Sequence, residues 1–419
     1  MCKKRMTGMI GAALCVSLLL AGCSVSLPDF FKIELPKLTA ETQEEPAALQ
    51  ENTVIILERD EADADAVQTL PQDDLAAVQE TLVSQDTGNY VYEQLDENAK
   101  LIYSEILSIL KEHGKEVQVS TVDTELIDKA FKCVMLDHPE IFYITGYSIT
   151  KYTRGNAVEK ITLSGTYTMD AEQEKQKQLV IDAYADACLA GLPEGADEYE
   201  KVKYIYEYLI QNTEYDLNAP ENQNILSVFL EGKSVCQGYA KATQYLLYKA
   251  GVFCTLVEGS VKGREAHVWN LVRVNGSYYY VDTTWGDASY NLTSDGGTPS
   301  VQVPEINYDY LCVPETMIAG THIISETVPL PQCISMQDNY YVREGIYFER
   351  VDEMQLNEAF ANAYSQKQAS VTLKCSNESI YTALYQYLIW EEKIFDYLQN
   401  DESVSYVEMN DQLSLLFYL

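Results

Sequence analysis

Two runs rich in β-branched and aromatic residues flank the dipeptide Asn275-Gly276. The first run is HVWNLVRV and the second is SYYYVDTTW. Asn-Gly is the strongest short-range signal for a two-residue type I′ turn, which requires positive φ at both positions. The pattern therefore predicts a β-hairpin. Because the turn fixes the register, counting outward from it places Trp269 opposite Asp282.

This register brings two chemically useful side chains together. His267 lies two residues before Trp269, so strand alternation puts it on the same face as Asp282. Diagonal cross-strand neighbours of this kind are roughly 7 Å apart at the backbone, within side-chain reach. A carboxylate placed there can bind one imidazole nitrogen and leave the other free to accept a proton. We therefore expect Asp282 to orient His267 as a base.

A third candidate, Cys236, belongs to a predicted helix. Downstream of Cys236, apolar residues recur at helical spacing as far as Gly251, a natural C-terminal stop. Ser234 is the expected N-cap, which would put Cys236 in the first turn. There the helix dipole favours a thiolate, and the unpaired amides could bind an oxyanion. The expected chemistry is attack of the Cys236 sulfur on an acyl carbon.

Three motifs together resemble the transglutaminase-like superfamily of papain-type folds. They are VCQGYAKA around Cys236, AHVWNLVRVNGSYYYVDTTWGD around His267 and Asp282, and THIISETVPLPQC further on. The resemblance covers residues 195–335. It implies an α+β, papain-like core in which the helix bearing the cysteine packs on an antiparallel sheet bearing the other two residues. It also implies Cys236 as nucleophile, His267 as base and Asp282 as orienting residue. Thr283 departs from the family pattern, in which proline often follows the aspartate.

Three aromatic residues are further candidates for this site. Tyr215, in the segment NTEYDLN, could donate a hydrogen bond to the oxyanion. Trp269 and Trp285 could stack against a substrate, or they could pack around the site. The triad residues also have structural alternatives, since a lone cysteine is usually a small buried residue. The shared hairpin register favours the catalytic interpretation.

The first 22 residues have the pattern of an export signal. Basic residues at positions 3–5 precede a mostly apolar run that is too short to span a bilayer. The run ends in Leu-Ala-Gly-Cys at residues 20–23, which resembles a bacterial lipobox. We expect removal of residues 1–22 and a lipid on Cys23 that anchors the protein at the extracytoplasmic face of the cell membrane. An ordinary signal peptide is the alternative.

The formal net charge of −35 argues against a nucleic-acid partner, because an acidic surface repels phosphates. We expect a protein or peptide substrate instead. Of the ten cysteines, seven remain without residues 1–22 and Cys23, so at least one is unpaired. Most of these should be buried core residues. The sequence contains no Cys-x-x-Cys pair and its four histidines are scattered, so we expect no metal and no other cofactor.

Composition suggests how the rest of the chain is organised. Between residues 40 and 74 there are eleven acidic residues and one basic residue, so residues 23–90 should form a disordered acidic tether. Residues 91–194 should form an N-terminal α+β region, residues 195–335 the catalytic domain and residues 336–419 a small α+β module. In that module, NYYVREGIYF is expected to be a pair of strands. His138, in the segment DHPE, is expected to be structural.

The expected activity follows from the thiol. Attack on a peptide or carboxamide bond would leave a thioester, which water would hydrolyse or an amine would convert into a cross-link. Hydrolysis, as in a cysteine protease, is the preferred interpretation. The alternatives are a transglutaminase that cross-links surface proteins and a non-catalytic interaction module of the same fold.

Overall fold

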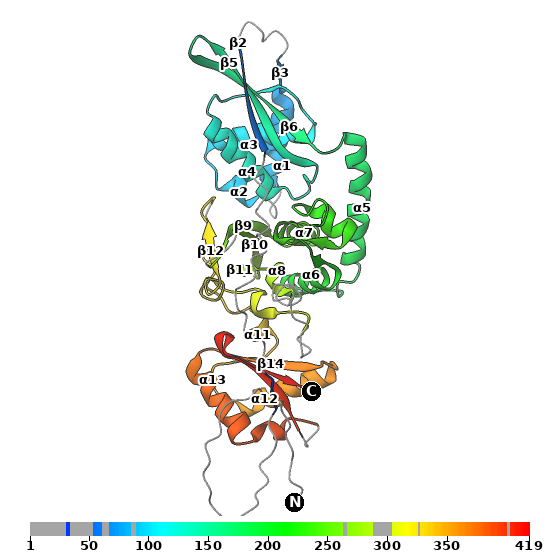
Figure 1. Ribbon diagram of the computed structural model, residues 1–419, viewed down its shortest axis with the longest axis vertical. Coiled ribbons are helices and arrows are strands. Elements are labelled where there is room, and N and C mark those ends of the chain that lie inside the picture. Colours follow the sequence, from blue (N-terminus) through cyan, green and yellow to red (C-terminus); the bar gives the residue numbers. More distant parts are fainter. Residues whose placement is uncertain are drawn as a thin grey trace, which may run out of the picture. The chain divides into compact units, whose positions relative to one another are not determined.

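The computed structural model describes residues 31–33, 53–60, 67–84, 89–262, 266–287, 304–325, 327–399 and 403–419. The chain divides into two compact units (Figure 1). The larger unit comprises Gln43–Tyr290 and Glu305–Ser335, and the smaller one comprises Met1–Thr42, Asn291–Pro304 and Met336–Leu419. The predicted N-terminal region and catalytic domain therefore lie in one unit. The proposed export signal and Cys23 lie outside the described residues.

The first part of the larger unit is a five-stranded sheet with helices packed on it. The sheet has the order β2-β5-β6-β4-β3. Its strands are β2 (Thr53–Asp60), β3 (Gln68–Thr69), β4 (Val117–Val119), β5 (Ile144–Arg154) and β6 (Ala157–Tyr167). Its helices are α1 (Gln72–Ser84), α2 (Tyr90–Glu93), α3 (Glu97–Lys111) and α4 (Thr124–Asp137). The core between these layers contains Ile106, Phe131, Ile149 and Leu163.

The structure differs from the predicted tether at β1 (Phe31–Ile33), β2, β3 and α1. The acidic average over this segment conceals the local run Val54–Leu57, which has the β-branched character of a strand and pairs in parallel with β5. In α1, Leu82 is buried, which gives that helix an apolar anchor. Average composition therefore predicted disorder where short apolar runs specify structure.

The second part of the larger unit has the predicted α+β arrangement. An antiparallel sheet with the order β11-β10-β9-β12 packs against helix α7 (Cys236–Lys249). The strands are β9 (Cys254–Val261), β10 (Ala266–Val274), β11 (Ser277–Val281) and β12 (His322–Ser325). The neighbouring elements are α5 (Ala171–Leu189), α6 (Glu198–Asn212), β7 (Glu214–Tyr215), the π-helix Ser227–Glu231, β8 (Lys233–Ser234), α8 (Thr283–Gly286) and α10 (Glu315–Ile318).

The predicted hairpin register is confirmed. Val274 pairs with Ser277, and the ladder continues outward in step from the turn. Asn275 has a φ of 50° and Gly276 a φ of 80°, so both turn residues occupy the left-handed region that a type I′ turn requires. One face of the sheet then contributes to a hydrophobic core that includes Trp269, whose side chain is fully buried.

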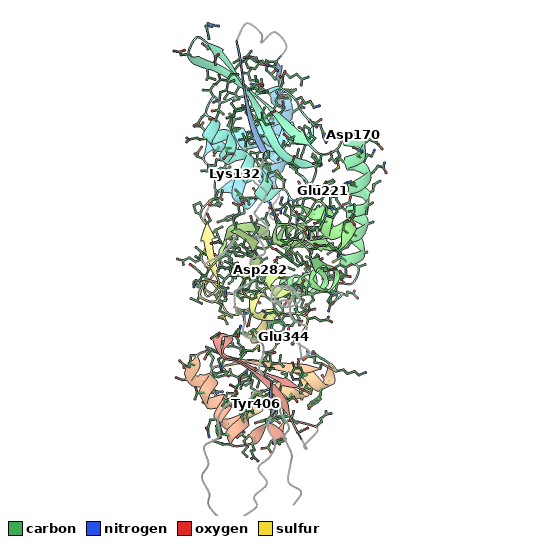
Figure 2. The ribbon with its side chains drawn as sticks, in the orientation of Figure 1. Lys132, Asp170, Glu221, Asp282, Glu344 and Tyr406 are labelled. Carbon is green, nitrogen blue, oxygen red and sulfur yellow. The ribbon has the colours of Figure 1, made fainter. Side chains whose placement is uncertain are left out.

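Helices α5 and α6 begin at acidic side chains. Asp170, labelled in Figure 2, caps α5 and forms a capping box with Gln173. Asp197 caps α6 in the same way with Glu200. Such caps satisfy amides that have no partner within the helix. Helix α7 lacks a side-chain cap, which matters for the site described below.

The smaller unit contains a five-stranded sheet with the order β1-β15-β16-β14-β13. Its strands are β1 (Phe31–Ile33), β13 (Tyr347–Phe348), β14 (Ser370–Cys375), β15 (Ser405–Met409) and β16 (Ser414–Tyr418). Its helices include α11 (Tyr340–Arg343), α12 (Glu353–Ser365) and α13 (Glu378–Tyr385). The predicted strand pair in NYYVREGIYF is therefore wrong in its first half, because the Asn339 side chain caps a helical turn.

Candidate active site

Cys236 is the first residue of α7, and the cap differs from the prediction. The N-cap residue is Val235, which offers no side-chain hydrogen bond to the helix. Ser234 instead lies in β8, and its Oγ is 3.0 Å from the carbonyl oxygen of Asn222 and 2.7 Å from Ser227 Oγ. The N-cap side chain therefore gives the first-turn amides of α7 no acceptor, which leaves them available to a developing oxyanion.

Gly238 allows the preceding segment to approach this helix turn closely. A Cβ at this position would lie 1.9 Å from Ser234 Oγ and 3.0 and 3.1 Å from the carbonyl oxygens of Asn222 and Asn224. Any other residue would push these groups away from the start of α7. Glycine within a helix costs about 0.5–1 kcal/mol relative to alanine, and here the cost is offset by the contact that it permits.

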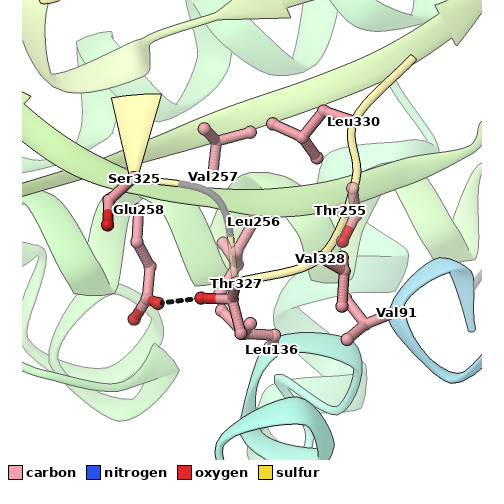
Figure 3. Close-up of a pocket in the computed structure, with 10 residues that line it drawn as sticks. All are labelled: Val91, Leu136, Thr255, Leu256, Val257, Glu258, Ser325, Thr327, Val328 and Leu330. Atoms are coloured by element: carbon pink, nitrogen blue, oxygen red, sulfur yellow. Dashed lines mark hydrogen bonds between the residues drawn. The ribbon is translucent and has the colours of Figure 1, made fainter. Parts of the chain in front are cut away.

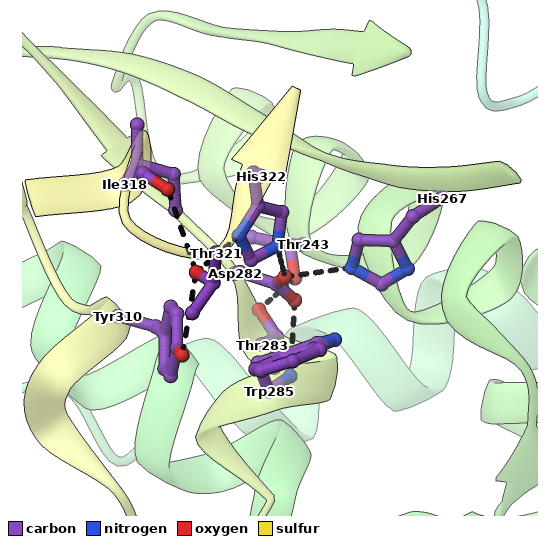
Figure 4. A network of polar contacts seen from close by, with 9 residues as sticks. All are labelled: Thr243, His267, Asp282, Thr283, Trp285, Tyr310, Ile318, Thr321 and His322. Atoms are coloured by element: carbon purple, nitrogen blue, oxygen red, sulfur yellow. Dashed lines mark hydrogen bonds and ion pairs between the residues drawn. The ribbon is translucent and has the colours of Figure 1, made fainter. Parts of the chain in front are cut away.

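His267 and Asp282 form the predicted hydrogen bond. Nε2 of His267 lies 2.7 Å from Oδ2 of Asp282, and both side chains are buried (Figure 4). The backbone amide of Trp285 donates to Asp282 Oδ1 at 3.0 Å, because Asp282 is also the N-cap of α8. Since Nε2 is bound to the carboxylate, Nδ1 is the nitrogen of His267 left for another partner.

The buried pair favours the imidazolium–carboxylate state. Burial alone would lower the pKa of His267, but the charge and hydrogen bond of Asp282, together with interactions with Cys236, raise it to about 10. Burial alone would raise the pKa of Asp282, but the charge and hydrogen bond of His267 and the hydrogen bond of His322 hold it well below its usual range. His267 therefore carries a proton at neutral pH, beside the Cys236 thiol.

Two side-chain contacts hold the helix and strand that carry these residues. Asn270 Nδ2 on β10 donates to the carbonyl oxygen of Ala240 on α7 at 2.9 Å. The hydroxyl oxygens of Thr243 and Thr283 are 2.7 Å apart, which joins α7 to α8. Both contacts are buried. They link the elements bearing Cys236, His267 and Asp282 within one unit.

His322 belongs to this site, and sequence reasoning gave it no role. It begins β12, and its Nε2 is 2.9 Å from the same Oδ2 of Asp282 that His267 contacts. His322 lies in the segment THIISETVPLPQC, where no local signal connects this histidine with the hairpin. The connection depends on β12 pairing with β9, which neither a turn nor a spacing specifies.

The same three side chains could also hold a metal ion. One ligand atom from each of His267, Asp282 and His322 lies within 4.8 Å of the others. Two imidazoles and a carboxylate are a donor set that suits zinc and other transition metals. The four histidines are scattered in the sequence, but the fold brings two of them to one carboxylate.

The aromatic candidates lie in different settings. Trp269 is fully buried, with its ring centroid 5.8 Å from that of His267, so it packs beside the pair and offers no surface to a substrate. Trp285 is partly exposed, with its ring 5.2 Å from His322. Tyr215 pairs with Ser234 across β7 and β8, which places its backbone close to the start of α7. Its role as an oxyanion donor stays a prediction.

His138 interacts with a neighbour in its own motif. Its Nδ1 is 2.8 Å from Glu140 Oε1. The preceding residue, Asp137, accepts hydrogen bonds from the amides of Val91 and Tyr92 and from the hydroxyl of Tyr103. These contacts join α2, α3 and α4, in agreement with a structural interpretation of the motif.

The seven described cysteines are all buried, and none of them is joined to another in a disulfide. Burial raises the pKa of four other thiols to about 12 and that of Cys254 further. The four are Cys133, Cys188, Cys333 and Cys375. These thiols are expected to be inert at neutral pH, because the thiolate is the reactive form.

A separate pocket lies on the larger unit (Figure 3). Its lining is mostly apolar and includes Val91, Leu136 and Val257, while Glu258 accepts a hydrogen bond from Thr327 Oγ1 at 3.1 Å. None of the three proposed catalytic residues lines it. The pocket therefore does not enlarge the site around Cys236.

Comparison with known proteins agrees with this geometry. Residues 188–283 match the family model of the transglutaminase-like superfamily. The chain carries a transglutaminase-like domain. The match includes Cys236, His267 and Asp282, and it ends at Thr283.

Two curated relatives share part of this domain. Mouse kyphoscoliosis peptidase is 28% identical over 119 residues, which are 25% of this chain and 18% of the mouse protein. The human protein of the same name is 29% identical over 111 residues, which are 23% of this chain and 17% of the human protein. The similarity therefore spans about a fifth of each relative. A solved TGase structure is 16% identical with a TM-score of 0.25, covering 34% of this chain and 44% of that one.

Among the residues that the structure describes, no helix is both long and apolar enough to cross a membrane.

Proposed function

We propose that this protein is a thiol enzyme that acts on peptide or carboxamide bonds. The observation that carries the proposal is the buried 2.7 Å hydrogen bond between His267 and Asp282, whose imidazole also interacts with Cys236 at the start of α7. A protonated imidazole and a helix N-terminus both favour a thiolate. An interaction module would have no need for this buried charged pair beside a thiol.

The proposed reaction has two steps. The Cys236 sulfur attacks the carbonyl carbon, and the charge that develops on the oxygen is bound by first-turn amides of α7. The carbon–nitrogen bond then breaks, His267 gives its proton to the departing ammonia or amine, and a thioester remains. In the second step, His267 takes a proton from water or from an acceptor amine as that molecule attacks the thioester. The thiolate leaves, which restores the enzyme.

Hydrolysis is the activity that we favour. Both curated relatives are named as peptidases, which supports water as the acceptor of the acyl group. Transfer to an amine is the second candidate, because the matched family model is that of the transglutaminase-like superfamily. The two activities differ only in the nucleophile that resolves the thioester.

One assay separates these activities. The protein is incubated with casein and a labelled primary amine, beside a Cys236→Ala variant and a Cys254→Ala control that removes a different buried thiol. We expect new N-termini from the wild type and from Cys254→Ala, and none from Cys236→Ala. Incorporation of the amine without cleavage would favour transfer. Equal results for the wild type and Cys236→Ala would contradict the thiol mechanism.

We also propose that a lipid on Cys23 anchors the protein outside the cytoplasmic membrane. The support is the Leu-Ala-Gly-Cys tetrad at residues 20–23 after a short apolar run. Cys23→Ala should release the protein from the membrane fraction of the expressing bacterium. Retention of the variant in that fraction, at the level of the wild type, would contradict the anchor.

A further inference from the structure

The Asp282 carboxylate receives hydrogen bonds from three donors. Its Oδ1 accepts from the Trp285 amide at 3.0 Å, while Oδ2 lies 2.7 Å from Nε2 of His267 and 2.9 Å from Nε2 of His322. An ionised carboxylate only accepts hydrogen bonds, so both imidazoles must present Nε2–H to Oδ2. The position of that oxygen is therefore set from two sides, as Figure 4 shows.

The imidazole of His322 is itself held in place. Its Nδ1 lies 2.7 Å from the hydroxyl oxygen of Thr321, and its side chain is completely buried. Three aromatic rings surround it, those of Trp269, Trp285 and Tyr310, with centroid distances of 4.9, 5.2 and 5.7 Å. A ring packed in this way cannot turn without moving its neighbours, so it offers Asp282 a donor in a fixed position.

The approach of β12 to the site depends on a glycine. Gly259 on β9 pairs with His267 on one side and with Ile324 on the other. A Cβ at Gly259 would lie 2.1 Å from the carbonyl oxygen of Ile323 and 2.6 Å from the Trp269 ring. Glycine at this position thus lets β12, with His322 at its start, lie close to β9 and to the Trp269 ring.

We propose that His322 is a positioning residue whose Nε2–H holds the Asp282 carboxylate in the orientation in which it binds His267. This inference rests on the proposed function of Cys236 and His267. Without His322, the charged form of this buried carboxylate is less stable, and Oδ2 is no longer held from two sides while the Trp285 amide still holds Oδ1, so the carboxylate can rotate about that contact. Removal of His322 should therefore weaken the hold of Asp282 on His267 without any change in the residues that react.

The test compares two substitutions at His322 with a matched control elsewhere in the unit. His322→Leu removes the donor, whereas His322→Gln keeps an N–H at similar reach. Tyr103→Phe is the control, because Tyr103 also donates to a buried carboxylate that two backbone amides hold, that of Asp137. All measurements are made in the presence of EDTA, so that no adventitious metal occupies the site.

The first readout is the NMR signal of the Nε2–H proton that His267 shares with Asp282, in histidine-labelled protein with only four histidines to assign. A proton in a short imidazole–carboxylate hydrogen bond is strongly deshielded, so the proposal predicts an upfield shift in His322→Leu, where Asp282 no longer holds this bond in line. It predicts a signal near that of the wild type in His322→Gln and in Tyr103→Phe. An unchanged signal in His322→Leu, with the fold intact by circular dichroism, would overturn the proposal.

The second readout is the rate of Cys236 alkylation by iodoacetamide as a function of pH. The rate at neutral pH should fall about tenfold in His322→Leu and recover in His322→Gln. A variant that was merely less stable would lower neither quantity, as Tyr103→Phe should demonstrate. If Cys236 of the wild type reacts no faster than the other thiols, the proposed function fails. The NMR signal of the shared proton would still decide whether His322 positions Asp282.

Discussion

The buried His267–Asp282 pair should make the stability of the larger unit depend on pH in a defined window. The pKa of His267 is raised from 6.5 to about 10 in the folded protein. Its contribution is therefore fully present below pH 6.5 and is lost as the pH rises toward the folded value. Within this window the folded chain holds one proton that the unfolded chain has released.

The size of the effect follows from that proton. One proton of difference changes the free energy of unfolding by about 1.4 kcal/mol per pH unit, so it should fall by about 3 kcal/mol between about pH 7.5 and pH 9.5. His267→Gln removes the titrating group and should abolish this contribution to the pH dependence of the free energy of unfolding. Both proteins carry Cys236→Ala, so that ionisation of that thiol makes no contribution. Because Cys236 is one of the groups that raise the pKa of His267, about 3 kcal/mol is the upper limit for this pair of proteins.

The assay is urea denaturation at each pH, monitored by tryptophan fluorescence. The chain has three tryptophans, of which Trp269 and Trp285 lie in the larger unit and Trp390 in the smaller. Trp390 is 71% exposed, so Trp390→Phe should remove its signal at little cost to stability. If the free energy of unfolding falls equally steeply with pH in the proteins with and without His267, the buried ion pair is refuted.

Two further substitutions test the packing around the site. Gly259→Ala should lower the free energy of unfolding by about 1–3 kcal/mol, since the new Cβ would overlap the Ile323 carbonyl and the Trp269 ring; an unchanged urea midpoint would show that β12 does not need this close approach. Tyr103→Phe should cost about 1–3 kcal/mol, because the buried Asp137 loses a donor at 3.0 Å. A thermal melt equal to that of the wild type would contradict this second expectation.

The sequence was most informative where local rules determine geometry. Asn275-Gly276 determined the hairpin register, and alternation then placed His267 beside Asp282, as the structure has them. The helix after Cys236 was also predicted, because its apolar spacing and Gly251 are local signals. Both predictions needed only the turn chemistry and the periodicity of one segment.

The remaining features depend on contacts between distant segments. His322 reaches Asp282 because β12 pairs with β9, and no local signal specifies that pairing. Ser234 was the best N-cap by residue type, yet its hydroxyl bonds to Asn222 and Ser227 in another segment. Strand β2 was overlooked because the acidic residues around it dominated the average composition.

The central claim is that Cys236, His267 and Asp282 act together to make one thiol reactive. The most direct test is the rate at which each cysteine of the purified protein reacts with iodoacetamide at about pH 6.5, measured by mass spectrometry. The account predicts that Cys236 reacts fastest, and that Asp282→Asn removes its advantage over the other six described thiols. Equal reactivity of Cys236 and the other buried cysteines in the wild type would contradict it.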